Sequence, residues 1–287
     1  MPELPEVETI RRDLAERITG KKIAGVSVRH AKTVRGAPAV FSRRLVGRSV
    51  RAIHRVGKLL IFIFDVPDYQ LLVHLKMTGQ LIYRGQTALV AGGHFLSGAV
   101  LELPGRHTRV VISFSDGAEL FFNDMRLFGY MHLSDPETVD RVKKTYGIEP
   151  LTPDFTLERF QKIVRPRRTS IKAVLLRQNL IAGLGNIYAD EACFRAGIRP
   201  DRPARGLTPE EIVRLHRACE HVIRLGIKHR GTTFNSFVDA DGRSGGFLRL
   251  LRVYGRDGER CLGCKTALIK KIRTAGRGTH FCPVCQV

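Results

Sequence analysis

Four cysteines near the C-terminus have the spacing of a metal site. Cys261 and Cys264 form one Cys-x2-Cys pair, and Cys282 and Cys285 form a second. Two such pairs offer the four thiolates of a tetrahedral Zn²⁺ shell, and a filled shell leaves no open coordination position. The spacing therefore predicts one structural zinc ion. A disulfide framework is the alternative, but it is disfavoured because the chain has no export signal. An iron-sulfur or redox role is also less favoured, because a basic hairpin separates the two cysteine pairs.

The first eight residues, MPELPEVE, hold a second group of candidates. Pro5, Glu6 and Glu8 suit the first turn of a helix, where unpaired N–H groups carry partial positive charge. Apolar residues follow at spacings of three and four, which predicts an amphipathic helix that ends near residue 20. Pro2 and Glu3 precede this pattern, so they remain available for chemistry.

The charge balance predicts an acidic partner. The 287 residues include 48 Lys and Arg against 27 Asp and Glu, a net charge of +21. Nucleic acid is the first candidate, because the basic residues are spread over the chain as on a folded surface that follows a phosphate backbone. A membrane surface is less favoured, and a solvated basic surface without a partner is the alternative. The acidic N-terminus lacks the features of a signal peptide, so we expect a cytoplasmic protein.

The elements that must position these residues follow from periodicity. Short β-branched and aromatic runs predict a β-sandwich or barrel between residues 21 and 134, while 85–106 is either a long loop or an extra strand pair. The expected strands are 25–29, 48–53, 58–64, 70–75, 109–114 and 118–123. A proline-rich segment, 135–152, is the expected interdomain linker. A helix capped by Thr208 and Glu211 follows, and Cys193 and Cys219 are expected to be buried.

Five motifs resemble one family in order and spacing along essentially the whole chain. They are PELPEVET (2–9), HLKMTGQL (74–81), MRLFG (125–129), GLGNIYADE (183–191) and GRGTHFCPVCQ (276–286). Together they resemble the bacterial formamidopyrimidine-DNA glycosylase (Fpg, MutM) family. The resemblance implies an α+β multidomain fold: an N-terminal β-sandwich with an N-terminal helix (1–134), the linker, a helix-two-turns-helix domain (153–247) and a C-terminal β-hairpin zinc finger (248–287).

The resemblance also implies a bifunctional DNA glycosylase and abasic-site lyase of base excision repair. Family members lose Met1, and the amine of Pro2 attacks C1′ of a damaged nucleotide to give a Schiff base. An α-amine suits this role, because about a tenth of it is neutral at pH 7. Glu3 supplies a proton at the sugar, Glu6 orders the site, and Lys58 assists elimination; without the resemblance, Lys58 would be a surface lysine. Arg277 contacts the lesion phosphates and aids the second elimination.

A base inside a duplex must be flipped out, and a side chain must fill the gap. Met77, Arg126 and Phe128 match the gap-filling residues of the family, although by position alone Met77 and Phe128 would be core residues. The remaining residues implied in DNA binding are His74, His107, Arg167, Asn186 and Lys172, the last of them near the lesion. Residues 231–247 correspond to the loop that covers the flipped base.

The implied substrates are oxidised purines (8-oxoguanine and formamidopyrimidines) in duplex DNA, released before β,δ-elimination. The sequence departs modestly from its relatives at Met125 and Leu127, where Pro and Arg are frequent. Two alternatives remain. One is an endonuclease VIII-like glycosylase for oxidised pyrimidines, and the other is a nonenzymatic zinc-ribbon DNA-binding protein. We expect a monomer at the bacterial nucleoid, with no membrane or nucleotide cofactor.

Overall fold

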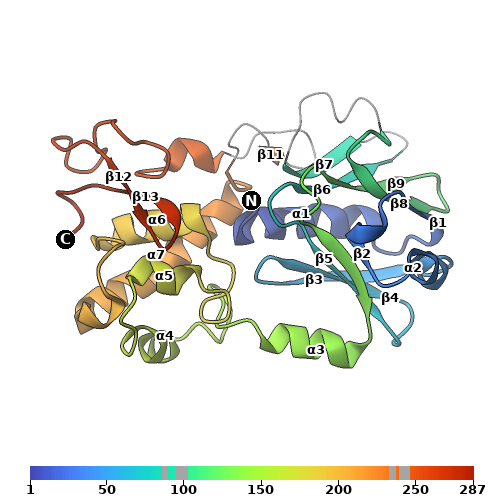
Figure 1. The fold of residues 1–287 in the computed structure, drawn as a ribbon, viewed down its shortest axis with the longest axis horizontal. Coiled ribbons are helices and arrows are strands. Elements are labelled where there is room, and N and C mark those ends of the chain that lie inside the picture. Colours follow the sequence, from blue (N-terminus) through green and yellow to red (C-terminus); the bar gives the residue numbers. More distant parts are fainter. Residues whose placement is uncertain (86–88, 95–102, 233–236, 239–245) are drawn as a thin grey trace. The chain divides into compact units, whose positions relative to one another are not determined.

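The computed structural model of the chain divides into two compact units (Figure 1). It describes residues 1–85, 89–94, 103–232, 237–238 and 246–287. The N-terminal unit comprises Met1–Lys144 with His229–Leu248, and the C-terminal unit comprises Thr145–Lys228 with Arg249–Val287. Residues 231–247, which the sequence interpretation joins to the second domain, thus group with the N-terminal unit. The other domain limits stay a prediction.

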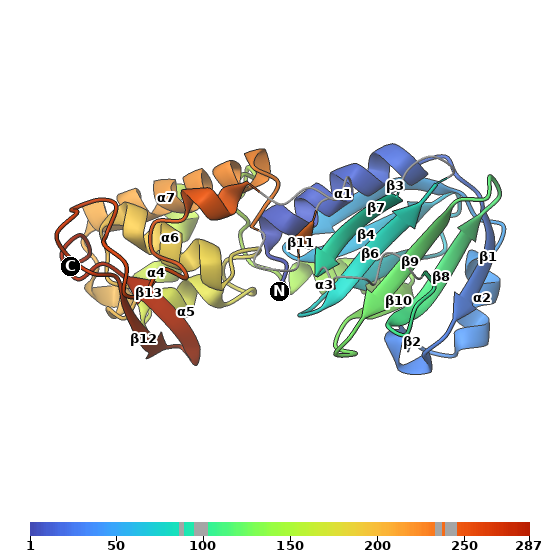
Figure 2. The same ribbon diagram turned by 90° about the horizontal axis from the view of Figure 1, so that it is seen from above.

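Helix α1 (Leu4–Ile18) confirms the predicted N-terminal helix. Glu3 is its N-cap, Pro5 lies in its first turn, and its apolar stripe, Val7, Ile10, Leu14 and Ile18, is buried. The helix lies beside strands β3, β4 and β7 (Figure 2). The stripe joins the main hydrophobic core of the N-terminal unit, so burial of this face fixes the helix that carries Glu3 and Glu6.

Two sheets enclose that core and form the predicted sandwich. The first has the strand order β1 (Ile23–Val28), β8 (Thr108–Phe114), β9 (Glu119–Asp124), β6 (Gly79–Arg84), β7 (Leu89–His94) and β11 (Phe237–Val238). The second has the order β2 (Val34–Arg35), β10 (Tyr130–Ser134), β5 (Gln70–His74), β4 (Leu59–Phe64) and β3 (Val50–Val56). Alternating residues such as Leu60 and Phe62 of one sheet and Val110 and Ile112 of the other meet in the core. All six predicted strands are confirmed within a few residues.

The sequence did not reveal several elements of this unit. Helix α2 (Pro38–Leu45) interrupts the region predicted as β-structure; Pro38 is its first residue, and Phe41 and Leu45 share its buried face. Strands β2, β6 and β10 were also not predicted. A 3-10 turn, η1 (Ala31–Thr33), precedes β2. For 85–106 the sequence allows a long loop or an extra strand pair, and the structure has strand β7 there. Residues 86–88 and 95–102 lie outside the described residues.

Helix α3 (Pro136–Lys144) occupies half of the segment predicted as a linker. By sequence, the prolines of this segment indicate a domain boundary, but Pro136 is the first helical residue and suits a helix start. The Asp135 carboxylate accepts a hydrogen bond from the Thr138 backbone N at 2.7 Å, which caps the helix. The proline-rich composition of this segment therefore concealed a helix.

The C-terminal unit contains the helices α4 (Leu157–Val164), α5 (Ile171–Leu176), α6 (Asn186–Ala196) and α7 (Pro209–Lys228), with 3-10 turns η2 (Ala204–Gly206) and η3 (Phe247–Leu250), the latter at the border of the units. The predicted capping box of α7 is confirmed: Thr208 N donates to Glu211 Oε2 at 2.8 Å, and Glu211 N donates to Thr208 Oγ1 at 3.2 Å. Cys193 and Cys219 are fully buried, as expected.

Strands β12 (Lys270–Thr274) and β13 (Arg277–Phe281) form the predicted C-terminal hairpin. The two-residue turn between them, Ala275 and Gly276, has positive φ at both positions (53° and 70°), as a type I′ turn requires. The turn places Arg277 at the tip of the hairpin. Among the residues that the structure describes, no helix is long and apolar enough to cross a bilayer.

Candidate active site and nucleic-acid interface

Pro2 and Glu3 lie at the start of α1, where Glu6 holds the backbone. The Glu3 N–H, directly after Pro2, donates to Glu6 Oε2 at 2.9 Å. The side chain of Glu3 is buried, with 3% exposed. Met1 is exposed and still acylates the Pro2 nitrogen, so this nitrogen becomes a nucleophilic secondary amine once Met1 is removed. The geometry combines a potential amine with two carboxyl groups.

Glu6 also binds the beginning of the predicted lesion-covering loop, 231–247. Its Oε1 accepts hydrogen bonds from Thr232 N at 2.8 Å and Thr232 Oγ1 at 3.1 Å. Gly231 has φ of 83°, and a Cβ atom there would lie 2.7 Å from Glu6 Oε1, so this approach requires glycine. Thr232 belongs to that predicted loop, but its contact with Glu6 was not predicted. Residues 233–236 and 239–245 of the predicted loop lie outside the described residues.

A second contact chain joins α1 to the turn that carries Lys58. The Glu8 carboxylate accepts a hydrogen bond from Arg55 Nε at 3.1 Å, and Arg55 also donates to the Gly57 carbonyl at 2.8 Å. Burial raises the pKa of Glu8, but hydrogen bonds from Arg11 and Arg12 and the charges of Arg55 and Arg11 outweigh it and lower the pKa to about 2. The ionised Glu8 thus fixes the β3–β4 turn, in which Lys58 is buried, next to the first turns of α1.

His74 lies one strand away from Lys58, because Leu59 pairs with His74 between β4 and β5. Burial, and then the positive charges of Lys76, Lys58 and Arg35, lower the pKa of His74 to about 3. Its Nδ1 accepts a hydrogen bond from Lys76 N at 3.0 Å. The imidazole is therefore neutral at physiological pH and carries its proton on Nε2, which suits donation to a phosphate oxygen.

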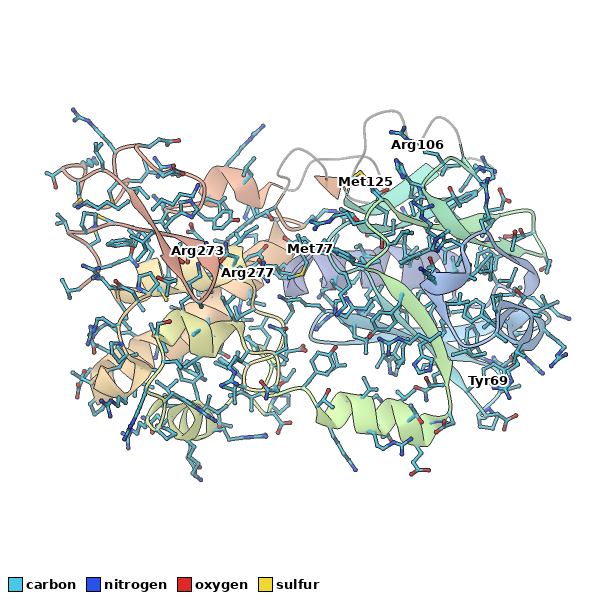
Figure 3. All side chains as sticks on the ribbon, viewed as in Figure 1. Tyr69, Met77, Arg106, Met125, Arg273 and Arg277 are labelled. Carbon is cyan, nitrogen blue, oxygen red and sulfur yellow. The ribbon has the colours of Figure 1, made fainter. Side chains whose placement is uncertain are left out.

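The gap-filling candidates lie on two loops at one end of the first sheet. Met77 lies two residues before the start of β6, residues 125–129 immediately follow β9, and Gly79 pairs with Asp124 in the register of these strands. Figure 3 labels Met77 and Met125, one from each loop. The strand register therefore brings together two motifs that are about fifty residues apart in the sequence.

Asp124 joins the two loops through its buried carboxylate. It accepts hydrogen bonds from the Thr78 hydroxyl, from Arg126 N at 3.2 Å and from Gly129 N at 2.7 Å. Phe128 projects into solvent with 53% of its surface exposed, and the Arg126 guanidinium lies 4.7 Å from the centre of its ring. Neither Asp124 nor Thr78 was predicted as a site residue, although Thr78 lies within the motif 74–81 and Asp124 directly precedes the motif 125–129. The result is an apolar wedge beside a cation.

His107 lies at the same end of the sheet. Its carbonyl accepts a hydrogen bond from Asp124 N at 3.0 Å, at the start of β8. Burial, and then the charges of Arg106 and Arg109, lower the pKa of the His107 imidazole, which favours its neutral form. The guanidinium groups of Arg106, Arg109 and Arg126 thus add positive charge at this end of the sheet, which is suited to phosphate oxygens.

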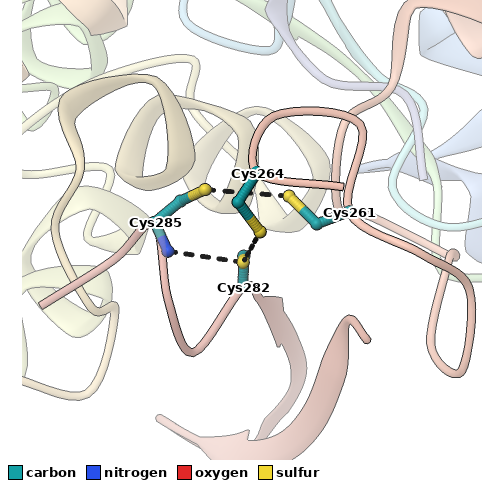
Figure 4. Close-up of side chains that lie close together, drawn as sticks. All are labelled: Cys261, Cys264, Cys282 and Cys285. Atoms are coloured by element: carbon teal, nitrogen blue, oxygen red, sulfur yellow. Dashed lines mark hydrogen bonds between the residues drawn. The ribbon is translucent and has the colours of Figure 1, made fainter. Parts of the chain in front are cut away.

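The four cysteine sulfurs of the C-terminal unit surround one point (Figure 4). All lie within 4.8 Å of one another; Cys261 and Cys285 Sγ are 3.8 Å apart, and Cys264 and Cys282 Sγ are 3.7 Å apart. Four sulfurs at about 2.3 Å from a zinc ion would be about 3.8 Å apart, so the donors fit tetrahedral zinc. The Thr266 hydroxyl and nearby backbone N–H groups lower the pKa of Cys264 to about 6, whereas burial raises the pKa of Cys282 and of Cys285.

The remaining candidates of the C-terminal unit differ in exposure. Arg277 is exposed at the hairpin tip, and Asn186 begins α6 with its Nδ2 donating to the Gly278 carbonyl at 3.0 Å. Arg167 is half-buried between α4 and α5. Lys172 differs from the expectation of a DNA contact, because its side chain is fully buried against Asp190. The sequence just before Lys172 is rich in arginine, which indicates an exposed segment and gives no sign of this interior position.

Comparisons with known proteins cover the whole chain. Family models match for the formamidopyrimidine-DNA glycosylase N-terminal domain (residues 1–131), its H2TH domain (146–238) and a zinc finger found in FPG and IleRS (258–287). The formamidopyrimidine-DNA glycosylase of Pelotomaculum thermopropionicum is 42% identical over 290 residues, which span 100% of this chain and 99% of the relative.

Solved structures of Lactococcus lactis Fpg are also similar. They are complexes with DNA that contains an abasic site, with DNA that contains Fapy-dG (a mutant protein), and with DNA that contains an oxidised pyrimidine. Each is 36% identical and covers 99% of both chains, and the TM-scores are 0.88, 0.87 and 0.87, respectively.

Proposed function

Because the chain belongs to the formamidopyrimidine-DNA glycosylase family, it is a DNA glycosylase that acts on damaged DNA, and we propose that it excises oxidised purines from duplexes. In this proposal 8-oxoguanine and formamidopyrimidines are released through a Schiff base on Pro2, and β,δ-elimination then cuts the strand. The observation that carries the proposal is the start of α1, where Glu6 holds the backbone N–H that directly follows Pro2.

Pro2 is the nucleophile. After removal of Met1, its neutral secondary amine attacks C1′ of the damaged nucleotide, and the bond from C1′ to the base breaks as the base leaves with a proton. Opening of the sugar ring gives an iminium between the Pro2 nitrogen and C1′, which withdraws electrons from C2′. The buried Glu3 carboxyl protonates the ring oxygen, and Glu6 keeps Glu3 and Pro2 in place through the Glu3 backbone.

Elimination follows without a further cofactor. Loss of a proton from C2′ expels the 3′ phosphate, and a second elimination expels the 5′ phosphate. Lys58 assists the proton transfer, and its fixed turn next to α1 supports this role. Arg277, exposed at the hairpin tip, stabilises the departing phosphates.

Base flipping relies on the two loops joined by Asp124. Met77 and Phe128 enter the gap left by the extruded nucleotide, and Arg126 donates hydrogen bonds to the orphaned base. The exposure of Phe128 next to the Arg126 guanidinium supports this assignment, since an exposed aromatic side chain beside a cation is suited to stacking on bases.

Phosphate contacts position the duplex. We assign them to exposed or half-buried donors of both units: His74, His107, Arg126, Arg167, Asn186 and Arg277. Asn186 stands at the N-terminus of α6, where backbone N–H groups favour an anion. The four cysteines, Cys261, Cys264, Cys282 and Cys285, bind one structural Zn²⁺ ion, which supplies the folding free energy of the hairpin.

Oxidised pyrimidines are the second candidate substrates, because the similar L. lactis protein has been captured with DNA that contains one. The Met77, Arg126 and Phe128 set favours purines as the main substrates. We further propose that the protein acts as a monomer at the bacterial nucleoid and needs no nucleotide cofactor.

Borohydride trapping on duplexes with single defined lesions tests the proposal. Reduction of the iminium should join protein to DNA at residue 2, and peptide mapping should locate the adduct on Pro2. Protein that retains Met1 is the matched control, because an acylated Pro2 nitrogen cannot attack while the DNA-binding residues are unchanged. A crosslink on Lys58, or strand cleavage by the Met1-retaining protein, would contradict the Pro2 assignment. Faster excision of oxidised pyrimidines than of 8-oxoguanine would contradict the substrate assignment.

A further inference from the structure

Lys172 on α5 and Asp190 on α6 form a fully buried ion pair. Lys172 Nζ lies 2.6 Å from Asp190 Oδ1, and both side chains have 0% of their surface exposed. A buried ammonium is tolerated when it is paired and hydrogen-bonded. Here the ammonium also donates to the Thr279 hydroxyl at 2.8 Å and to the Gly278 carbonyl at 3.1 Å. Its partners therefore include the two residues that follow Arg277.

These contacts lead directly to the backbone of Arg277. The Thr279 hydroxyl accepts from Lys172 and donates to the Arg277 carbonyl at 3.2 Å. The Gly278 carbonyl accepts from both Lys172 and Asn186. On the other side of Arg277 lies the Ala275–Gly276 turn, where a Cβ atom at Gly276 would meet nothing within 4 Å. Lys172 and Asn186 thus hold the peptide groups after Arg277, whereas the turn residues before it are exposed to solvent.

Asp190 completes the attachment of the strand. Its Oδ2 accepts a hydrogen bond from His280 N at 2.9 Å, so one carboxylate contacts both Lys172 and the backbone of β13. Its neighbour on α6, Glu191, accepts hydrogen bonds from the backbone N–H groups of residues 252–254, all within 3.1 Å. Two adjacent carboxylates of α6 therefore fix the strand that carries Arg277 and the chain that leads into the zinc-binding segment.

We propose that Lys172 and Asp190 are positioning residues, which act on DNA through Arg277 rather than by contact. The buried pair holds the backbone of Arg277 at a constant spacing from Asn186 through Gly278 and Thr279, so that this backbone is already ordered before the arginine meets its phosphate. Without these hydrogen bonds the backbone at Arg277 would have to be ordered on binding, at a cost in conformational entropy. This inference rests on the proposed phosphate contact of Arg277, and it replaces the expectation that Lys172 itself contacts DNA.

The first test uses Thr279, whose hydroxyl links Lys172 to the Arg277 carbonyl. Thr279→Val removes the hydroxyl at nearly constant volume, and Thr279→Ser keeps it. Loss of the two hydrogen bonds should weaken DNA binding and strand cleavage by about tenfold in the Val variant, with zinc content unchanged, while the Ser variant stays within about twofold of the parent. Equal activity of the two variants would show that the hydroxyl does not position Arg277.

The second test is a double-mutant cycle in the full chain, with affinity for an abasic-site duplex measured over a salt series. Lys172→Met with Asp190→Asn removes the charges together, so no unpaired buried charge remains. This change should weaken binding by about tenfold when Arg277 is present and by less than about twofold in the Arg277→Ala background. The same loss in both backgrounds would mean that Lys172 acts independently of Arg277 and would overturn the inference.

The cycle also separates the inference from the function on which it rests. If Arg277→Ala by itself changes neither affinity nor its salt dependence, the proposed phosphate contact fails, and the positioning role fails with it. If Arg277→Ala weakens binding and lowers the salt slope by about one unit, but the buried pair acts additively, only the positioning role fails. If the charge-free variant loses its zinc, the Thr279→Val and Thr279→Ser pair decides the outcome.

Discussion

Replacement of Asp124 by Asn should separate base extrusion from strand cleavage. The Asp124 carboxylate accepts from Gly129 N at 2.7 Å through one oxygen, and from Arg126 N at 3.2 Å and the Thr78 hydroxyl through the other. An amide turns one of these acceptors into a donor, so at least one backbone N–H must face an N–H group. A hydrogen bond to a buried charged group contributes about 1.5–3 kcal/mol.

We therefore expect Asp124→Asn to lower the free energy of unfolding by about 2–3 kcal/mol, measured by urea denaturation. The same free energy is needed to restore the two loops to their native geometry during base extrusion, which corresponds to about a 30- to 150-fold slower excision of 8-oxoguanine. Cleavage at a preformed abasic site, where no base is extruded, should fall by less than about threefold.

Single-turnover rates on the two duplexes test this expectation. Asp140→Asn is the matched control, because Asp140 is an exposed residue paired with Lys143 at 3.2 Å, and its loss should change stability by less than about 0.5 kcal/mol. If Asp124→Asn slowed both reactions equally, Asp124 would serve the stability of the sheet rather than the geometry of the loops. An unchanged excision rate would remove the loops from base extrusion altogether.

Met77→Ala should slow excision from a duplex yet spare cleavage at a preformed abasic site, as measured by single-turnover assays; equal losses would indicate a packing role. Cys282→Ser should release the one zinc ion per chain and weaken DNA binding, and metal analysis that finds full zinc occupancy would contradict the four-cysteine site. Glu8→Gln should lower stability by about 2 kcal/mol at pH 7. Because the pKa of Glu8 is depressed to about 2, its stabilisation is present above about pH 4.5 and disappears as the pH falls towards 2. Urea unfolding should therefore show that the difference in free energy of unfolding between parent and variant shrinks over this range. A constant difference would rule out the charge of Glu8 as its source.

Much of the fold could be predicted because its signals are local. Residues close together in the sequence are enough to predict the apolar stripe of α1, the capping box at Thr208 and Glu211, and six strands. The cysteine pairs are equally local, and their assembly into one site was confirmed. Helix α2 was not predicted because its eight residues are too few to show a clear helical periodicity. Only Phe41 and Leu45 form its buried face, and the patterns on both sides of it are typical of strands.

The sequence by itself determined which groups could do chemistry: an N-terminal proline beside glutamates, four thiols with zinc spacing, and a large excess of positive charge. Tertiary structure alone decided how they are held, because the partners lie far apart in the chain. Glu6 meets Thr232, Asp124 meets Thr78, and Lys172 meets Thr279 only after folding. The case of Lys172 shows the physical reason. A lysine is ordinarily exposed, since burial of its charge costs free energy, and only the packing of α5, α6 and β13 supplies the carboxylate, hydroxyl and carbonyl that make its burial possible.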